Sequence, residues 1–250
     1  MSNKPDDKLR KYHLDVLQQR LLEATPLLAA PFVEMLPEGR LREAKDNALD
    51  IAELRIDRFA AREPSAIIAS AEHYAGFIRL ATIRMVTEGG GWQEDEETRL
   101  GLFRAVFPCV EMVDVELRAP IVHDVLTDAR AAGCVVMLSF HDFKHMPSLG
   151  VLQDMLDEAS SLGADLTKIA VHTNTQDDLQ NLARLLLDNR DKRLVVIAMG
   201  KASLVSRIFF PALGSRITFG YVDQPSSPGQ VPLRLMHECM QVFYGTPASS

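Results

Sequence analysis

Residues 164–171 read ADLTKIAV, a short apolar run typical of a buried strand, with Lys168 near its centre. A lysine in such a strand has two interpretations. Its aliphatic stem can pack against the core while its ammonium group reaches water. Alternatively, a lysine that is removed from water loses its proton more easily and becomes an amine nucleophile. The rest of the chain bears on which interpretation applies.

Further strand candidates alternate with helix-like stretches along the chain after residue 27. Several of the helix-like stretches end at a glycine, as at Gly133 and Gly163, which is a common helix stop signal. Eight strand–helix units of about 25 residues each predict an α/β fold of the (β/α)8 TIM-barrel type. The strand candidates are residues 26–32, 51–56, 78–86, 110–117, 134–140, 165–171, 193–199 and 215–220.

The competing architecture is an open, doubly wound sheet, which usually carries a glycine-rich phosphate-binding turn after its first strand. PLLAAPFVEM, residues 26–35, contains no glycine, and this weighs against a dinucleotide-binding fold. No change in composition divides the predicted barrel, so we assign residues 28–250 to one catalytic domain. Residues 1–27 then form an N-terminal extension that is predicted to be helical.

The extension carries Leu14, Leu17 and Leu21 on one helical face. An apolar stripe of this kind has two interpretations. The helix either caps the bottom of the barrel or docks a partner. The sequence leaves both open.

Composition and charge limit the class of protein. The chain has 250 residues, of which 47% are hydrophobic and 24% are charged, as in ordinary globular proteins. Its net charge of -7 argues against a nucleic-acid or anionic-membrane partner, although a local arginine cluster can still bind a small anion. Three cysteines without metal-ligand spacing indicate reduced thiols. With no signal-peptide core and no run of roughly 20 apolar residues, a cytoplasmic location is expected.

Active-site residues of a barrel lie at the carboxyl ends of its strands. Alternate residues of a barrel strand face inward, so Glu53 and Arg55 share one face. If Lys168 points inward, it lies among apolar layers and near several arginines, and both conditions lower the pKa of a lysine. A neutral amine can attack a ketone and form an imine. His141 titrates near neutrality and is the candidate acid/base partner, with Glu88 as the group that orients it.

Each of these residues also has a purely structural interpretation. His141 could be a hydrogen-bonded structural residue, Arg207 a surface helix residue, and Glu53 with Arg55 a buried salt bridge. Many strands would then end in unrelated buried charges, each of which needs its own compensation. A single anionic, oxygen-rich ligand explains these charges more economically.

Two other motifs do not support a cofactor. The histidines of HDFKH, residues 141–145, straddle a strand end and a loop, so we do not predict a metal site there. The GKAS stretch at 200–203 lacks the glycine that a phosphate-binding loop needs five residues earlier, because Val195 occupies that position.

Taken together, the strand-end motifs resemble the type I 3-dehydroquinate dehydratases from about residue 28 to residue 235. Several separated motifs in the same order are far more specific than any one of them. The motifs are ELRID at 53–57, TIRMVTEGG at 82–90, VDVEL at 113–117, LSFHDF at 138–143, DLTKIAV at 165–171, SR at 206–207 and SSPGQ at 226–230.

The resemblance implies a reaction, the syn elimination of water from 3-dehydroquinate to 3-dehydroshikimate in the shikimate pathway. In the family the lysine that matches Lys168 forms an imine with the C3 ketone. The histidine that matches His141 removes the C2 proton and then protonates the departing C1 hydroxyl, and Glu88 matches the carboxylate that holds it. Arg207 matches the arginine that binds the substrate carboxylate, for which a planar guanidinium is suited.

The resemblance also implies further substrate contacts, the absence of a cofactor and an oligomeric state. Family members use no metal or organic cofactor, and many are homodimers. The remaining residues that match substrate contacts are Glu53, Arg55, Arg84, Ser226 and Gln230.

Three departures from the family pattern are visible. Leu54 stands where the family usually has tryptophan, Ser203 where glycine is common, and GWQED at 91–95 looks like an insert. They bear on loop closure, rate and subunit contacts, and they remove no catalytic group. Two other functions stay open, another imine-forming barrel such as an aldolase, and a degenerate barrel that only binds a ligand.

Overall fold

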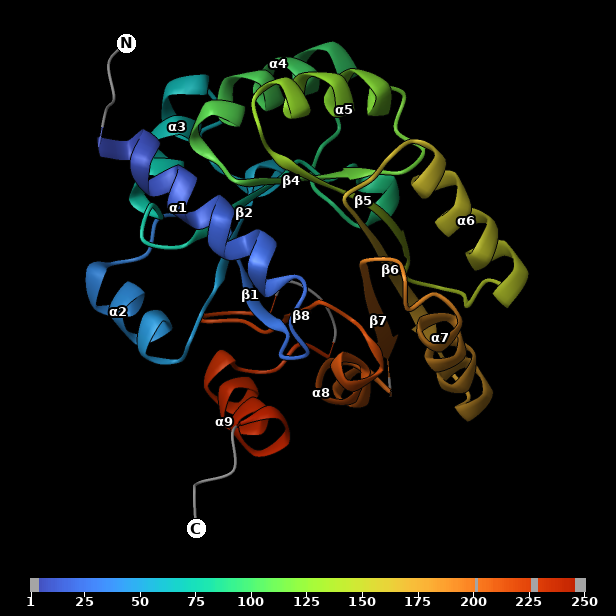
Figure 1. The fold of residues 1–250 in the computed structure, drawn as a ribbon. Helices are drawn as coiled ribbons and strands as arrows, with labels where there is room; N and C mark the ends of the chain where they lie inside the picture. Colours follow the sequence, from blue (N-terminus) through green and yellow to red (C-terminus); the bar gives the residue numbers. More distant parts are fainter. Residues whose placement is uncertain (1–4, 201, 226–228, 246–250) are drawn as a thin grey trace.

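The structure is a computed structural model that describes residues 5–200, 202–225 and 229–245. Eight parallel strands form one sheet in the order β7-β6-β5-β4-β3-β2-β1-β8. An isolated bridge between Leu194 and Ser215 brings the two edges of this sheet together. The result is a nearly closed (β/α)8 barrel with an added N-terminal helix, and the predicted fold is confirmed (Figure 1). The strands are β1 (Leu27–Phe32), β2 (Ile51–Arg55), β3 (Ile78–Thr82), β4 (Met112–Glu116), β5 (Val135–Asp142), β6 (Leu166–Thr173), β7 (Leu194–Gly200) and β8 (Ile217–Phe219).

Helices surround the barrel, as Figure 1 shows. Three short 3-10 helices follow β2, β3 and α4, namely η1 (Ile56–Arg58), η2 (Val86–Glu88) and η3 (Phe107–Cys109). The α-helices of the described residues are α1 (Pro5–Arg20), α2 (Glu38–Asp46), α3 (Pro64–His73), α4 (Glu96–Val106), α5 (Val122–Ala131), α6 (Leu149–Ser161), α7 (Gln176–Asp188), α8 (Ser203–Leu213) and α9 (Leu233–Tyr244).

The third strand is shorter than the sequence predicted. It was expected to run to residue 86, but β3 ends at Thr82. The chain then folds back on itself, because the Trp92 amide donates to the carbonyl of Arg84 and the Val86 amide donates to the carbonyl of Trp92. Gly89 adopts a left-handed conformation, with φ of 76°, that permits this return.

The barrel interior changes from apolar to polar along the strands. On β2, β4 and β6 the inward-facing residue near the bottom is apolar, and the next inward-facing residue is charged. The apolar residues form an inner cluster at the bottom of the barrel, whereas the charged residues line a pocket or contact it. These successive pairs are Ile51 and Glu53, Met112 and Asp114, and Leu166 and Lys168.

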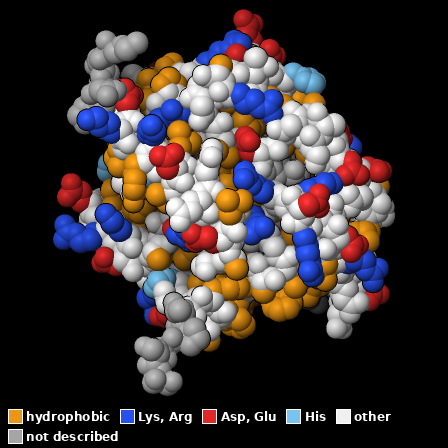
Figure 2. Space-filling model, in the orientation of Figure 1, with side chains coloured by type: hydrophobic (Ala, Val, Ile, Leu, Met, Phe, Trp, Pro, Cys, Tyr) orange, Lys and Arg blue, Asp and Glu red, His pale blue; other side chains and the backbone are white. Residues whose placement is uncertain are grey.

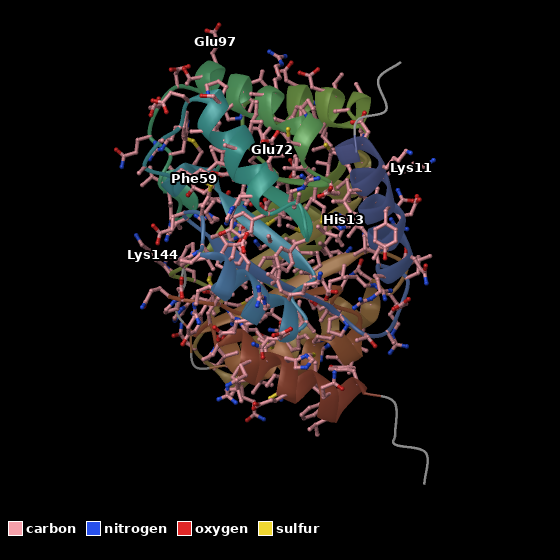
Figure 3. The ribbon with its side chains drawn as sticks, turned by 90° about the vertical axis from the view of Figure 1, so that its left-hand side faces the viewer. Lys11, His13, Phe59, Glu72, Glu97 and Lys144 are labelled. Carbon is pink, nitrogen blue, oxygen red and sulfur yellow. The ribbon has the colours of Figure 1, made fainter. Side chains whose placement is uncertain are left out.

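Helix α1 closes the bottom of the barrel. Leu17 and Leu21 are fully buried within the inner apolar cluster. The Arg10 guanidinium donates to the carbonyls of Val110 and Ala132, at the entry to β4 and β5. In Figure 3, α1 with His13 lies at one end of the barrel, and Phe59 and Lys144 lie toward the other. Of the two interpretations of the N-terminal leucines, capping is the one that the contacts support.

Candidate active site

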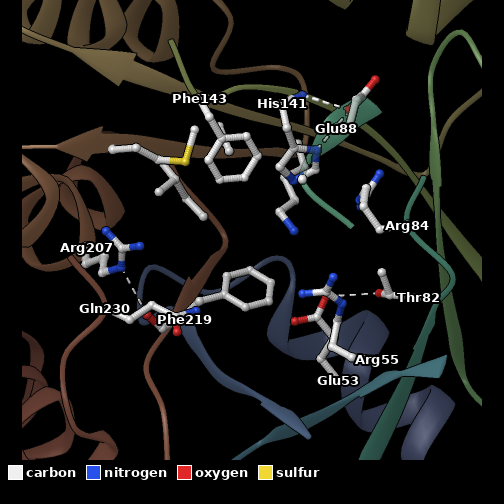
Figure 4. A pocket seen from close by; sticks show the side chains of 15 residues that line it. Glu53, Arg55, Thr82, Arg84, Glu88, His141, Phe143, Arg207, Phe219 and Gln230 are labelled. Carbon is white, nitrogen blue, oxygen red and sulfur yellow. Dashed lines mark hydrogen bonds and ion pairs between the residues drawn. The ribbon is translucent and has the colours of Figure 1, made fainter. Parts of the chain in front are cut away.

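One pocket brings together eight of the nine predicted site residues at the carboxyl ends of the strands (Figure 4). Arg207 faces His141 and Glu88 across this pocket. Ser226, the ninth residue, lies outside the described residues. The eight are Glu53, Arg55, Arg84, Glu88, His141, Lys168, Arg207 and Gln230.

The side chain of Lys168 is buried at the floor of the pocket, with only 6% of the residue exposed. Its amine donates to a carboxylate oxygen of Asp114 at 3.3 Å and lies 4.5 Å from the centre of the Phe219 ring. Arg55, Arg84 and Arg207 line the same pocket as Lys168, as predicted. The direct charged contact of the amine is an acid, and Arg84 binds the other oxygen of that acid at 2.6 Å. The interpretation in which the ammonium group reaches water is wrong, because the group is buried.

His141 and Glu88 form a pair beside the amine. The Nδ1 atom of His141 lies 3.1 Å from Oε2 of Glu88, and the His141 backbone amide donates to the same oxygen at 2.9 Å. Burial, reinforced by the charges of Arg84 and Lys168, holds the pKa of His141 well below its ordinary value. Burial likewise raises the pKa of Glu88 to about 7. The imidazole is therefore uncharged near neutral pH, with Nδ1 engaged and Nε2 available.

The two charged residues of β2 bind different partners. Arg55 donates through Nε and Nη2 to both carboxylate oxygens of Asp57, at 3.0 and 2.7 Å. Glu53 instead accepts a hydrogen bond from the hydroxyl of Thr82 at 3.0 Å. The interpretation of Glu53 and Arg55 as a mutual salt bridge is therefore wrong. Their side chains point into the same pocket, as their spacing predicted.

The GWQED stretch supports the segment that carries Arg84 and Glu88. Trp92 is fully buried, and its backbone bonds hold the returning chain after β3. Glu116 of β4 accepts from the Met85 amide at 2.8 Å and pairs with Arg99, which in turn donates to the backbone of the same segment. These contacts fix the position of a loop that regular strand pairing does not hold.

Arg207 is buried, with 2% of the residue exposed, so its interpretation as a surface helix residue is wrong. Its guanidinium donates to the carbonyls of Phe219 and Ser203, each at 3.1 Å. None of the ion pairs among the described residues involves Arg207, and burial lowers its pKa to about 10. A buried cation without an acidic partner favours an anionic ligand.

The hydroxyl of Ser203 makes two hydrogen bonds at this site. Its hydroxyl accepts a hydrogen bond from Arg207 and donates one to the carbonyl of Gly229. It therefore links the helix that carries Arg207 to the loop that precedes α9. A glycine at this position could make neither contact.

Sequence reasoning did not assign several residues that build the site. Asp114 lies in the VDVEL motif at 113–117, but no role in the site was predicted for it. The signal was available, because Asp114 lies two residues after the inward-facing Met112 of the same strand. The other pocket residues that were not assigned are Thr82, Gly89, Phe143, Ala170, Ile197, Met199 and Phe219.

Among the described residues, no three His, Cys, Asp or Glu side chains lie together so as to hold a metal ion. Among the helices described, none is long and apolar enough to span a membrane.

Fold and site together define a barrel enzyme with a buried lysine amine beside a histidine–carboxylate pair. The sequence profile of the type I 3-dehydroquinase family matches residues 26–247. The chain belongs to this family. The family, the barrel fold and the 3-dehydroquinate dehydratase function predicted from the sequence are thereby confirmed.

The sequences of related enzymes align with most of this chain. The 3-dehydroquinate dehydratase of Thermodesulfovibrio yellowstonii is 30% identical over 231 residues, which cover 89% of this chain and 98% of the relative. The enzyme of Klebsiella pneumoniae strain 342 is 32% identical over 235 residues, with coverage of 89% and 93%.

Solved structures of the same family superimpose on the barrel. The 3-dehydroquinate dehydratase of Geobacillus kaustophilus has a TM-score of 0.80 at 27% identity, with coverage of 89% of this chain and 93% of the other. The Clostridium difficile enzyme, solved with covalent modified comenic acid, has a TM-score of 0.79 at 25% identity, with coverage of 88% and 92%.

Proposed function

We propose that Lys168 is the amine that forms the imine with 3-dehydroquinate. The observation that carries this assignment is the burial of the Lys168 amine in one pocket with His141 and Glu88. The Lys168 ammonium first gives one proton to His141, and Nζ then adds to the C3 carbonyl. A second proton of the amine moves to the carbonyl oxygen, which takes back the proton held by His141 and leaves as water. The resulting iminium carries a positive charge that draws electrons from the adjacent C2–H bond.

His141 is the proposed acid and base. Its uncharged imidazole removes the C2 proton, and the electron pair of that bond moves toward the iminium nitrogen. The C1 hydroxyl then leaves as water with the proton that His141 returns, and a C1–C2 double bond forms. A second water hydrolyses the iminium and releases 3-dehydroshikimate and the Lys168 amine. Glu88 orients the imidazole through Nδ1.

Arg207 is the proposed site for the substrate carboxylate, because its buried guanidinium enters no ion pair among the described residues. The ring hydroxyls need polar partners that are held in place. The remaining proposed contacts are Glu53, Arg55, Arg84 and Gln230, together with Ser226, which lies outside the described residues.

Reduction with borohydride in the presence of 3-dehydroquinate tests the imine directly. We expect a reduced ligand adduct on the tryptic peptide that contains Lys168, detected by mass spectrometry. Reduction without substrate is the control and should leave that peptide unmodified. Dehydration that proceeds while no adduct is trapped on Lys168 would contradict the covalent assignment.

We further propose that the enzyme is a cytoplasmic homodimer of the shikimate pathway, with an N-terminal extension over residues 1–27 and a catalytic barrel over 28–250. Support for a dimer comes from helix α8, whose only charged residue, Arg207, is buried. Its exposed face carries apolar side chains, and Figure 2 shows hydrophobic side chains gathered where α8 and α9 lie. They are Leu204, Val205 and Phe209 on α8, and Leu235, Val242 and Phe243 on α9.

Sedimentation velocity tests the dimer. We expect a species with twice the chain mass of 27.8 kDa. The Phe209→Glu variant should shift the protein toward monomer, because it introduces a like charge from each subunit into a symmetric apolar contact. Leu187→Glu, on the outer face of α7, is the matched control and should sediment as the unmodified protein does. A wild-type chain that sediments as a monomer would contradict the proposal.

A further inference from the structure

Asp114 is a buried carboxylate to which the steps above give no part. The residue is 1% exposed and lies on β4, whereas Lys168 lies two strands away on β6. Its Oδ1 atom accepts hydrogen bonds from Nη2 of Arg84 and the hydroxyl of Ser139, both at 2.6 Å. Its Oδ2 atom accepts from the Lys168 amine at 3.3 Å.

This arrangement holds one carboxylate oxygen still and leaves the other facing the amine. Ser139 also accepts from Nη1 of Arg84 at 2.7 Å, so the guanidinium, the hydroxyl and the carboxylate form a closed triangle. Ser139 is directly opposite Lys168 in the strand register. Lys168 of β6 and Ser139 of β5 therefore both contact the Asp114 carboxylate of β4.

Asp114 stays negatively charged during the whole reaction. Burial alone would raise the pKa of Asp114, but the positive charges of Arg84 and Lys168 hold it well below its ordinary value. An acid that stays ionised in this way is a poor proton carrier. It is well suited to stabilise a fixed positive charge close to it.

We propose that Asp114 is the counter-ion of the imine nitrogen. The inference rests on the proposed function and deepens it. Nζ of Lys168 carries a positive charge both as ammonium and as iminium, and the Asp114 carboxylate is placed to stabilise each. Asp114 gains and loses no proton in the reaction, because the protons move through His141 and water. Its contribution is to keep the iminium charged, and therefore electron-withdrawing, when the C2 proton is removed.

Asp114→Asn tests this role, because it removes the charge and keeps the shape. The amide oxygen can still accept from Arg84 and Ser139. We expect kcat to fall by about 10²-fold or more, as when one preorganised group that stabilises developing charge is removed. The second readout is the pH dependence of Lys168 acetylation by acetic anhydride, followed by peptide mass spectrometry. Its midpoint should fall by about one pH unit or more, because the amine loses an opposite charge.

Asp50→Asn is the matched control. Asp50 is a partly buried aspartate, bonded to the Leu28 amide and to Arg20, and it lies at the entry to β2 at the bottom of the barrel. We expect its variant to keep kcat within about twofold of wild type and to leave the Lys168 labelling midpoint unchanged, because the sites are far apart. A purely structural role for Asp114 would change the melting temperature without shifting that midpoint.

The outcomes separate the two proposals. Wild-type protein that gives no borohydride adduct on Lys168 contradicts the proposed function. Where the adduct forms, an Asp114→Asn variant with normal kcat and a normal labelling midpoint overturns the counter-ion proposal. If that variant does not fold, Asp114→Ser, which leaves room for water beside Arg84, is measured instead. An unchanged midpoint in the serine variant also overturns the proposal.

Discussion

Lys168→Ala is expected to lower kcat by roughly 10⁴-fold or more, because removal of a covalent nucleophile eliminates the whole pathway that depends on it. The fold should survive. The Asp114 carboxylate that loses its amine partner keeps its hydrogen bonds to Arg84 and Ser139. Turnover can be followed by the ultraviolet absorbance of the product, in which the new double bond is conjugated with the C3 ketone.

Lys168→Met is the companion variant that separates chemistry from packing. Methionine fills most of the volume of the lysine stem beside the Phe219 ring without supplying an amine. We expect the methionine variant to be as inactive as the alanine variant. Its melting temperature should be higher than that of the alanine variant. If either variant retained more than about one hundredth of wild-type kcat, the lysine would not be the nucleophile.

His141→Ala is expected to lower kcat by about 10³-fold, within the range for loss of a general acid and base. The imine step needs the Lys168 amine, so borohydride should still trap some adduct on Lys168. His145→Ala is the matched control. His145 is four residues away and its side chain is 77% exposed, so its variant should turn over at the wild-type rate.

The pH profile of the wild-type enzyme tests the pair formed by His141 and Glu88. Burial raises the pKa of Glu88 to about 7, so Glu88 gains a proton as the pH falls through this value. Protonated Glu88 would donate to Nδ1 of His141 and leave the ring proton on Nε2, where it prevents removal of the C2 proton. We therefore expect kcat/KM to fall on the acid side of about pH 7. A flat profile between pH 6 and pH 8, or a fall on the alkaline side alone, would contradict this role for Glu88.

The positions of the strands could be read from the sequence, because the signal is local. A short apolar run between helix-like stretches marks a buried strand wherever it lies in the barrel. The exception was β3, which ends at Thr82 because Trp92 returns to pair with the chain after it. That pairing joins residues about eight positions apart through an irregular loop. The periodicity of the sequence does not predict it.

The inward-facing residues could also be predicted, because the side chains of a strand alternate. Their partners could not. Arg55 binds Asp57 and not Glu53, because the chain turns into η1 directly after β2. The Lys168 amine of β6 contacts Asp114 of β4. This second pair depends on how far neighbouring strands are displaced along one another, which no single strand encodes.

By itself the sequence determined the barrel, the family and the set of polar residues at the strand ends. Only the tertiary structure decided which of those residues meet. It placed Asp114 against the lysine amine and left Arg207 without an acidic partner among the described residues. The physical reason is one of range. Alternation and burial are properties of each strand, whereas the charge around Lys168 is the sum of side chains from several strands that converge only when the barrel closes.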